Sequence, residues 1–409
     1  MARNQKRGSK INKIELTLIL FSVFLLALVI IAGVVVGGAQ QFTLLAKAFL
    51  HGQLNFLHPI GGRGYDPILY KGKIFWSEGP FPAILLIPFI LIAELFHVFF
   101  DQGYLQWVLI LGIFYFIYSL ARKFKYSKKD SIYLILAFGL GSVFIGIESF
   151  SSSWMFAQVV TTFLLFWSLY EFYVVKKRRW WMLGIISGLI LLTRATASPI
   201  IIFFFLILWL EDESKDKRSK YIQLLLPFGI AIFLVGLYNY LRFGNATNGG
   251  FAYQVLFPQS AASRALGIFS IQHIPTNLYY MLLGSPNVAQ LSSASWTLKF
   301  PYIGSNNNGL SIFLTSPYLL TLFTNKWSSF KAQERYLLTA TLISIIFVLS
   351  YYGIGRNQFG YRYSLDFLPE LFVLFMIMYK KKNKVISRGM KILILGSGYF
   401  NFYLLNTVL

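Results

Sequence analysis

The chain contains no cysteine and only four histidines among its 409 residues. The lack of cysteine excludes disulfides, thiol nucleophiles and thiolate metal sites. The histidines do not have the spacing of metal ligands, so surface or packing roles are expected for them. They are His51, His58, His97 and His273. The sequence also lacks a glycine-rich phosphate loop with its lysine, a zinc-binding helix motif and a serine nucleophile elbow. Nucleotide-driven transport is therefore not supported.

Charge is scarce as well. Only 13% of the residues are charged, while 56% are hydrophobic and the mean hydropathy is +0.60. Long apolar runs recur along the chain, and in lipid such runs can satisfy their backbone groups only as helices. The composition therefore predicts an all-α polytopic membrane protein, with residues 1–409 forming a single integral membrane domain.

The few charges are mostly positive, and the formal net charge is +22. The basic residues fall in short runs between apolar segments, which is the distribution of the positive-inside rule and not that of a nucleic-acid surface. The first such run contains Lys6, Arg7, Lys10 and Lys13. The apolar run that follows, 14–36, is long and lacks a small-residue cleavage site, so it is expected to be an anchor with its N-terminus in the cytoplasm.

Residues 81–100 are apolar enough to cross the membrane, and charge decides whether they do. If this segment crosses, every later basic cluster lies outside. If it dips into the membrane or lies along the outer face, 27 of the 37 lysines and arginines lie inside. The second topology is preferred.

That topology predicts about 11 transmembrane helices. They are expected near residues 14–36, 104–121, 131–148, 156–174, 180–193, 199–210, 221–238, 309–323, 336–352, 366–379 and 392–408. Residues 37–103 then form a first outer loop with juxtamembrane or re-entrant helices, including an amphipathic helix at 42–50 with Lys47 toward water. Residues 238–308 form a long outer cap that is expected to be folded and partly helical.

The polar stretch from Tyr65 to Pro82, YDPILYKGKIFWSEGPFP, stands out in the first loop. It carries Asp66 and Glu78 beside Lys71 and Lys73 in a chain with only 15 acidic residues. Carboxylates and cations at a membrane surface are costly to desolvate, so they indicate chemistry or binding.

Other unusual polar residues are predicted to gather at the same outer face. They are Glu148, Trp154, Gln158, Arg194, Asn239, Arg242, Arg356, Tyr361, Arg362, Tyr363 and Asp366. A carboxylate that accepts a proton, opposite cations that hold a phosphate, is the minimum for transferring a group from a lipid phosphate to a hydroxyl. Asp66 or Glu78 is the candidate base. Arginine suits the phosphate because its planar fork can bind two oxygens.

Each candidate also has a structural alternative. Asp66 could pair with Lys71 or Lys73, and Arg362 with Asp366 one turn later. Arg194 could reach the lipid headgroups, Glu148 could be the partner of an arginine, and Trp154 could be an interfacial anchor. The runs KKRR and KKKNK are expected to determine topology and to contact anionic lipid.

Several stretches resemble the GT-C superfamily of polytopic glycosyltransferases, in particular bacterial proteins related to protein O-mannosyltransferases and aminoarabinose transferases. The stretches are YDPILYKGKIFWSEGPFPAILLIPF, LTRATASP, YNYLRFGNATNGGFAYQ and FGYRYSLDFLPE, in this order. The resemblance implies transfer of a sugar from a polyprenyl-phosphate donor to a glycan, lipid or protein acceptor. The transfer would occur at the outer face of the cytoplasmic membrane, with inversion and with a first-loop acid as the general base.

One departure concerns the residues immediately after the first span, where many relatives carry an acid and this chain has Gln40 and Gln41. The base role then passes to Asp66, and an inactive member stays an alternative. A divalent metal stays open as a cofactor, because relatives differ in this respect. The alternative function from another class is a flippase or transporter of lipid-linked glycans, which should carry polar residues along a path near mid-membrane.

Overall fold

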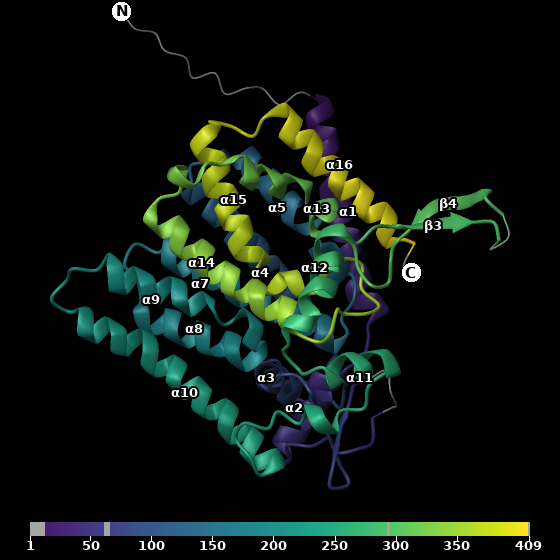
Figure 1. The fold of residues 1–409 in the computed structure, drawn as a ribbon, viewed down its shortest axis with the longest axis vertical. Coiled ribbons are helices and arrows are strands. Elements are labelled where there is room, and N and C mark those ends of the chain that lie inside the picture. The colour runs from purple at the N-terminus through teal and green to yellow at the C-terminus, as the bar shows by residue number, and fades with distance from the viewer. Residues whose placement is uncertain (1–12, 61–65, 293–294, 408–409) are drawn as a thin grey trace, which may run out of the picture.

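The computed structural model describes residues 13–60, 66–292 and 295–407 and shows a bundle of packed helices (Figure 1). The basic residues Lys6, Arg7 and Lys10, and Tyr65 of the polar loop, lie outside the described residues. The bundle helices are α1 (Lys13–Val36), α4 (Gln102–Lys123), α5 (Lys128–Gly139), α7 (Ser153–Tyr173), α8 (Trp180–Thr193), α9 (Ile200–Leu210), α10 (Lys217–Phe243), α14 (Ala332–Ser350), α15 (Leu368–Lys382) and α16 (Arg388–Leu405).

Shorter elements fill the connections. The α-helices among them are α2 (Gln41–Leu50), α3 (Phe81–Leu95), α6 (Phe144–Glu148), α11 (Pro258–Ala265), α12 (Ile274–Leu283) and α13 (Ile312–Thr315). The 3₁₀ helices are η2 (Ala195–Ala197), η3 (Phe251–Tyr253), η4 (Ile271–His273), η5 (Pro317–Thr324), η6 (Trp327–Ser329) and η7 (Arg362–Asp366). Two antiparallel hairpins pair β1 (Ile68–Tyr70) with β2 (Lys73–Phe75) and β3 (Asn287–Gln290) with β4 (Leu298–Gly304).

Within the described residues, five helices are long and apolar enough to cross a membrane: α1, α4, α7, α10 and α14. The other expected spans are shorter or interrupted, so the number of about 11 spans stays a prediction. The expected span 131–148 is α5 and α6 with a break at 140–143, and the expected span 309–323 is the single turn of α13 followed by η5. A 3₁₀ helix rises about 2.0 Å per residue against about 1.5 Å for an α-helix, so η5 extends farther than its eight residues would as an α-helix.

Local sequence signals account for several helix ends. Asp101 and Ser127 cap α4 and α5 by accepting hydrogen bonds from the backbone N–H groups of Gly103 and Asp130. At the C-terminal end of α10, Gly244 takes the left-handed conformation with φ 73°, which glycine adopts without strain.

The basic clusters meet at one end of the bundle, here named the basic end. Glu15 in the first turn of α1 forms ion pairs with Lys129 of α5 at 3.1 Å and Lys391 of α16 at 2.9 Å. Gln333 of α14 donates to the carboxylate of Glu211, after α9, at 2.7 Å. Helix starts and ends from four connections are thereby held at one level, as the positive-inside pattern predicts.

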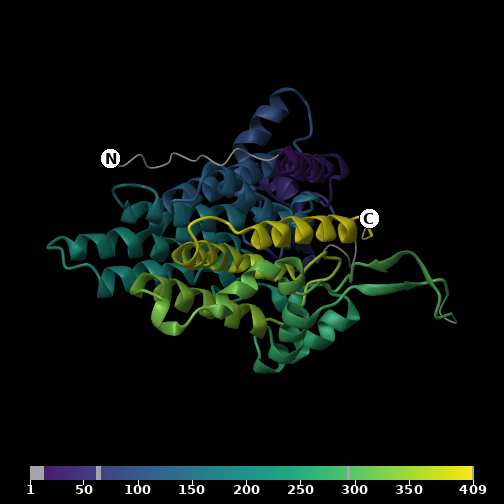
Figure 2. The same ribbon diagram turned by 90° about the horizontal axis from the view of Figure 1, so that it is seen from above.

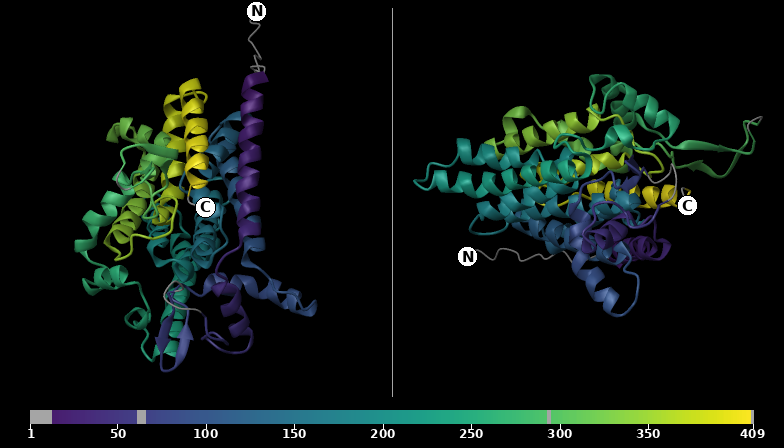
Figure 3. Two further views of the ribbon diagram at one scale, coloured as in Figure 1. Left: turned by 90° about the vertical axis from the view of Figure 1, so that its right-hand side faces the viewer. Right: turned by 90° about the horizontal axis from the view of Figure 1, so that it is seen from below.

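The first loop leaves and returns at the opposite end, here named the site end. The side-chain amide of Gln102, the first residue of α4, donates to the carbonyl of Ala39 at 3.1 Å, just after α1 ends. Because 40–101 therefore begins and ends at one level, α3 does not cross the bundle, which agrees with the preferred interpretation of residues 81–100. Figure 3 shows α3, in blue, projecting from the bundle near the end of α1. Lys47 of α2 pairs with Glu94 of α3 at 3.9 Å.

The cap over residues 238–308 is partly helical, as expected, and α12 coincides with the apolar patch at 274–283. The sequence analysis did not predict the β3–β4 hairpin, which projects away from the helices (Figures 1 and 2). Strand segments of four and seven residues with mixed side chains carry little periodic signal.

The two ends can be tested with single cysteines, because the chain has none of its own. Lys73→Cys, on the exposed β1–β2 hairpin, is expected to react with an impermeant maleimide on intact cells. Lys128→Cys, at the exposed start of α5, is expected to react only after permeabilisation. Labelling of both variants from one side would contradict this arrangement.

Candidate active site

Asp66 stands at the entrance of the β1–β2 hairpin, where the cap holds the first loop. Its φ is 47°, a left-handed conformation that is uncommon for residues other than glycine. The backbone N–H of Val255 donates to the carbonyl of Pro67 at 2.9 Å, and Ile68 forms an isolated β-bridge with Gln254. The cap therefore fixes the backbone on which the Asp66 carboxylate is mounted.

The Asp66 carboxylate is half-buried among charged and aromatic groups. Burial is the largest cause of its raised pKa of about 6, and the negative charge of Glu78 raises it further. The Arg362 guanidinium and a hydrogen bond from the Trp154 indole act in the opposite direction. A carboxyl group with this pKa can both hold and release a proton near neutral pH.

A chain of ion pairs runs from the first loop into the bundle. The Arg194 guanidinium, just after α8, binds Asp366 of η7 through two contacts of 2.6 and 2.9 Å. Its third nitrogen lies 3.8 Å from a Glu78 oxygen. The Thr196 hydroxyl also donates to Asp366. Such a bidentate pair fixes orientation as well as charge.

Gly79 explains how the first loop comes so close to the end of α8. A Cβ atom at this position would lie 2.2 Å from the carbonyl oxygen of Leu192. Only glycine therefore allows the backbone beside Glu78 to pack on the last turn of α8, where Arg194 begins its chain of ion pairs.

Arg362 is the second guanidinium of the site and is only 7% exposed. Its carbonyl accepts from Gln158 at 3.2 Å and its backbone N–H donates to Gln358 at 3.3 Å, so the main chain is held on both sides. The Nε–H group of Arg362 is buried with no hydrogen-bond partner among the described residues. The alternative pairing with Asp366 is not formed, because Asp366 binds Arg194 instead.

Tyr363 links the two guanidiniums. Its ring centroid lies 5.4 Å from the guanidinium carbon of Arg194 and 5.0 Å from that of Arg362. Both distances are in the range of cation–π attraction. The ring thus holds two like charges near each other, with the nearby carboxylates offsetting their repulsion.

Four of the predicted substrate-binding residues are exposed or have partners other than Asp66 and Arg362. Lys71 and Lys73 are exposed on the β1–β2 hairpin, and the Lys71 ammonium lies over Tyr70 at 5.3 Å, so neither pairs with Asp66. Arg242 donates to the carbonyl of Trp76 at 3.0 Å and to Asn239 at 2.9 Å. This pair clamps the first loop to α10, and its geometry is structural.

Tyr361 is also structural, because its buried hydroxyl donates to Asn277 of α12 at 2.9 Å.

The structure also changes the interpretation of two further residues, Trp154 and Glu148. Trp154 contacts Asp66 and is not merely an interfacial anchor. Glu148 is fully buried, and its carboxylate has no partner among the described residues, so it does not pair with an arginine there.

The two glutamines after α1 have separate surroundings. The Gln40 side chain accepts from the backbone N–H of Gln102 at 3.0 Å. Gln41 is 1% exposed, and its amide has no hydrogen-bond partner in the part of the chain that the structure describes. The described residues contain no group of three or more histidine, aspartate or glutamate side chains that could hold a metal ion.

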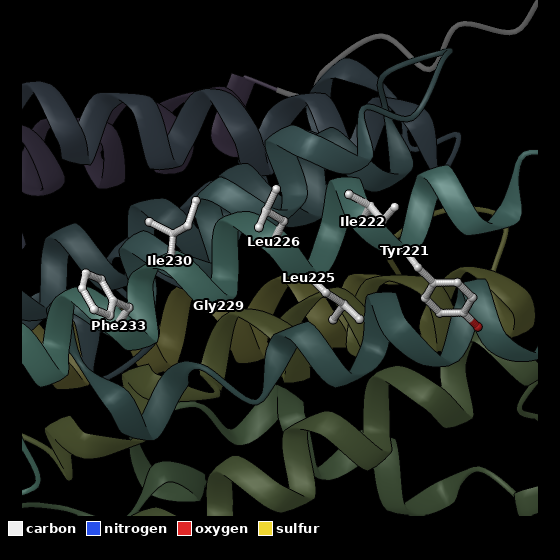
Figure 4. Close-up of a pocket in the computed structure, with 7 residues that line it drawn as sticks. All are labelled: Tyr221, Ile222, Leu225, Leu226, Gly229, Ile230 and Phe233. Atoms are coloured by element: carbon white, nitrogen blue, oxygen red, sulfur yellow. The ribbon is translucent and has the colours of Figure 1, made fainter.

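An apolar hollow lies far from this chemistry, on the surface of α10. It is lined by seven residues of that helix, with Gly229 leaving a gap between Leu225, Leu226 and Phe233 (Figure 4). The lining contains no carboxylate and no basic side chain. On an exposed helix of this apolar character, the hollow is suited to lipid chains.

No protein-family model matches the chain, and no curated protein matches it. The fold is similar to two solved structures of the oligosaccharyltransferase from Archaeoglobus fulgidus. One is the apo form, with 12% identity and a TM-score of 0.46 over 95% of this chain and 55% of that chain. The other is AglB in complex with an inhibitory peptide and a dolichol-phosphate, with 12% identity and a TM-score of 0.42 over 94% and 55% of the two chains.

The chain thus spans about half the length of these structures.

The Arg194–Asp366 pair is expected to be a main support of the site end. Asp366→Ala leaves the buried guanidinium without its partner, which should lower the free energy of unfolding by about 3–5 kcal/mol. Asp216→Ala, which removes the exposed partner of Lys220, is the control and should leave the free energy of unfolding nearly unchanged. Thermal unfolding in detergent measures both, and equal shifts would contradict the structural weight given to Asp366.

Proposed function

We propose that the chain is a glycosyltransferase of the cytoplasmic membrane that transfers a sugar from a polyprenyl-phosphate donor to an acceptor hydroxyl. The observation that carries the proposal is that Asp66, with its raised pKa of about 6, lies near enough to the buried guanidinium of Arg362 for that charge to act on its pKa. The basic end faces the cytoplasm and the site end faces outward. The acceptor is a glycan, a lipid or a protein.

Asp66 acts as the general base. The acceptor oxygen attacks the anomeric carbon while its proton passes to the Asp66 carboxylate. The new bond between the acceptor oxygen and the anomeric carbon forms as the bond from that carbon to the phosphate oxygen breaks. The polyprenyl phosphate leaves with the bonding electrons, and a single displacement inverts the anomeric carbon.

Arg362 binds the phosphate that leaves. Its Nε–H has no protein partner among the described residues, so it is available to a phosphate oxygen. A fixed cation in a partly dehydrated site stabilises charge that develops on the leaving oxygen. Arg194 is different, because Asp366 already occupies two of its nitrogens. Its role is to position Tyr363 and Glu78.

The alternative of a transporter would require polar side chains along a path through the bundle. Among the residues that the structure describes, two fully buried carboxylates have no hydrogen-bond partner, and neither lies at mid-helix. Glu148 is the last residue of α6, and Glu370 is the third residue of α15. Both positions are next to the site end, which favours chemistry there.

The pH dependence of transfer tests Asp66. A base must be deprotonated, so activity should rise about tenfold per pH unit below pH 6 and level off above it, since the pKa of Asp66 is about 6. Asp66→Asn should lower kcat by at least about a hundredfold at pH 7.5. Transfer from a panel of polyprenyl-phosphate sugars to acceptor by purified protein is the measurement.

Glu78→Gln serves as the companion variant. Removing this negative charge should lower the pKa of Asp66 and move the rising limb to lower pH. Trp154→Phe removes a hydrogen bond to the carboxylate and should move the limb to higher pH. Full activity of Asp66→Asn would assign the base role to another residue.

Donor affinity tests Arg362. Arg362→Ala should weaken binding of a polyprenyl-phosphate sugar by about tenfold or more, because a charge-assisted hydrogen bond to phosphate is lost. Arg388→Ala, an exposed arginine at the basic end, is the matched control and should leave donor affinity unchanged. Unchanged affinity in Arg362→Ala would leave this residue with a structural role only.

A further inference from the structure

A second pocket with a very different character lies at the basic end. Its lysines come from three separate parts of the chain: the α4–α5 turn, the start of α14 and the end of α15. They are Lys123, Lys125, Lys331, Lys380 and Lys381, and the pocket contains a single carboxylate, that of Glu334. The formal charge of these six side chains is +4, that is, five positive charges and one negative.

The protein itself neutralises little of this charge. Glu334 pairs with Lys381 at 2.9 Å, and the Lys380 ammonium lies over Tyr126 at 4.8 Å. The ammonium groups of Lys123 and Lys125 have no hydrogen bond or ion pair among the described residues, and both side chains are exposed. Five cations held near a single carboxylate repel one another, and a bound anion would reduce that repulsion.

The pocket is also partly apolar. Phe124 and Ile377 line it next to the lysines, and the Phe124 ring packs on that of Tyr173 with centroids 5.4 Å apart. Tyr173 also lines the pocket, and its hydroxyl is buried with no hydrogen-bond partner among the described residues. A ligand for this pocket therefore combines a negative, hydrogen-bonding group with an apolar part.

The position of the pocket along the spanning helices indicates which kind of molecule supplies both the negative group and the apolar part. Three of the five candidate spans end beside it: α4 ends at Lys123, α7 ends at Tyr173 and α14 begins at Ala332. The ends of spanning helices lie where the hydrocarbon of a bilayer gives way to its headgroups. A phosphate at this depth belongs to a lipid.

We propose that this pocket binds the headgroup of an anionic phospholipid from the leaflet at the basic end. The phosphate lies between the lysines of the α4–α5 turn and those of α14 and α15, with the Tyr173 hydroxyl as a further donor. The glycerol and the first acyl carbons pack on Phe124 and Ile377. This lipid site is separate from the candidate active site and does not depend on the proposed reaction.

The test uses the full chain in detergent and measures lipid retention by native mass spectrometry during titration with phosphatidylglycerol. Each lysine near a bound anionic headgroup contributes on the order of 1 kcal/mol, so the double variant Lys123→Gln/Lys125→Gln should weaken binding at least about tenfold. Lys176→Gln/Lys177→Gln removes the same charge from exposed positions at the basic end that do not line the pocket. This control should change binding by less than about twofold.

Further variants and competing ligands distinguish a specific lipid site from diffuse charge attraction and from a site for a soluble anion. Lys123→Arg/Lys125→Arg keeps the charge and should retain phosphatidylglycerol. Lys331→Gln removes a charge contributed by another part of the pocket and should also weaken lipid binding. Phosphatidylcholine should not compete, and inorganic phosphate should displace the lipid only at far higher concentration. Equal losses in the site variant and its control would overturn the proposal in favour of diffuse attraction, and displacement by phosphate at lipid concentrations would assign the pocket to a soluble anion.

Discussion

The ion pair between Arg194 and Asp366 is the contact on which the site end depends. It joins the end of α8 to η7, the turn that precedes α15, and the two side chains are only 10% and 1% exposed. Neither charge would be stable alone in such surroundings, whereas together they satisfy each other. Because two nitrogens of Arg194 are occupied, its plane is fixed. Glu78 of the first loop and the Tyr363 ring are then arranged around that plane, which brings Asp66 and Arg362 into one place.

Two buried arginines, Arg242 and Arg362, differ in whether the protein provides acceptors for their N–H groups, and this difference separates a structural arginine from a candidate ligand-binding one. Arg242 donates to Trp76, Asn239 and the carbonyl of Tyr238, and it holds the first loop against α10. Arg362 is equally well buried, yet its Nε–H finds no protein acceptor among the described residues. A buried donor without a partner costs free energy unless something else binds it. The same physical criterion, cations without protein partners, identifies the lysine pocket at the basic end.

The two ends use charge in opposite ways. At the basic end, the Glu15 carboxylate pairs with two lysines and draws three helix starts together, and the lysines there outnumber the carboxylates. At the site end, three carboxylates face two guanidiniums, so one of the acids must carry an unfavourable charge. That acid is Asp66, and its burial beside Glu78 is why its pKa approaches neutrality. Because the chain has few acids, each carboxylate has a large influence on the charge balance of its own surroundings.

The sequence by itself determined the membrane-type helical bundle, because hydrophobicity acts locally along the chain. It also predicts that the basic loops face the cytoplasm and that residues 81–100 do not cross the membrane, and both stay predictions. It also singled out Asp66, Glu78, Arg194 and Arg362. Only the tertiary structure decided their partners. Spacing along η7 suggested that Arg362 pairs with Asp366, but Arg194, 172 residues away, binds that carboxylate instead. Proximity in the first loop likewise suggested Lys71 and Lys73 for Asp66, whereas the hairpin turns both lysines to its exposed side. Contacts between distant segments depend on how whole helices pack, and no local pattern encodes that.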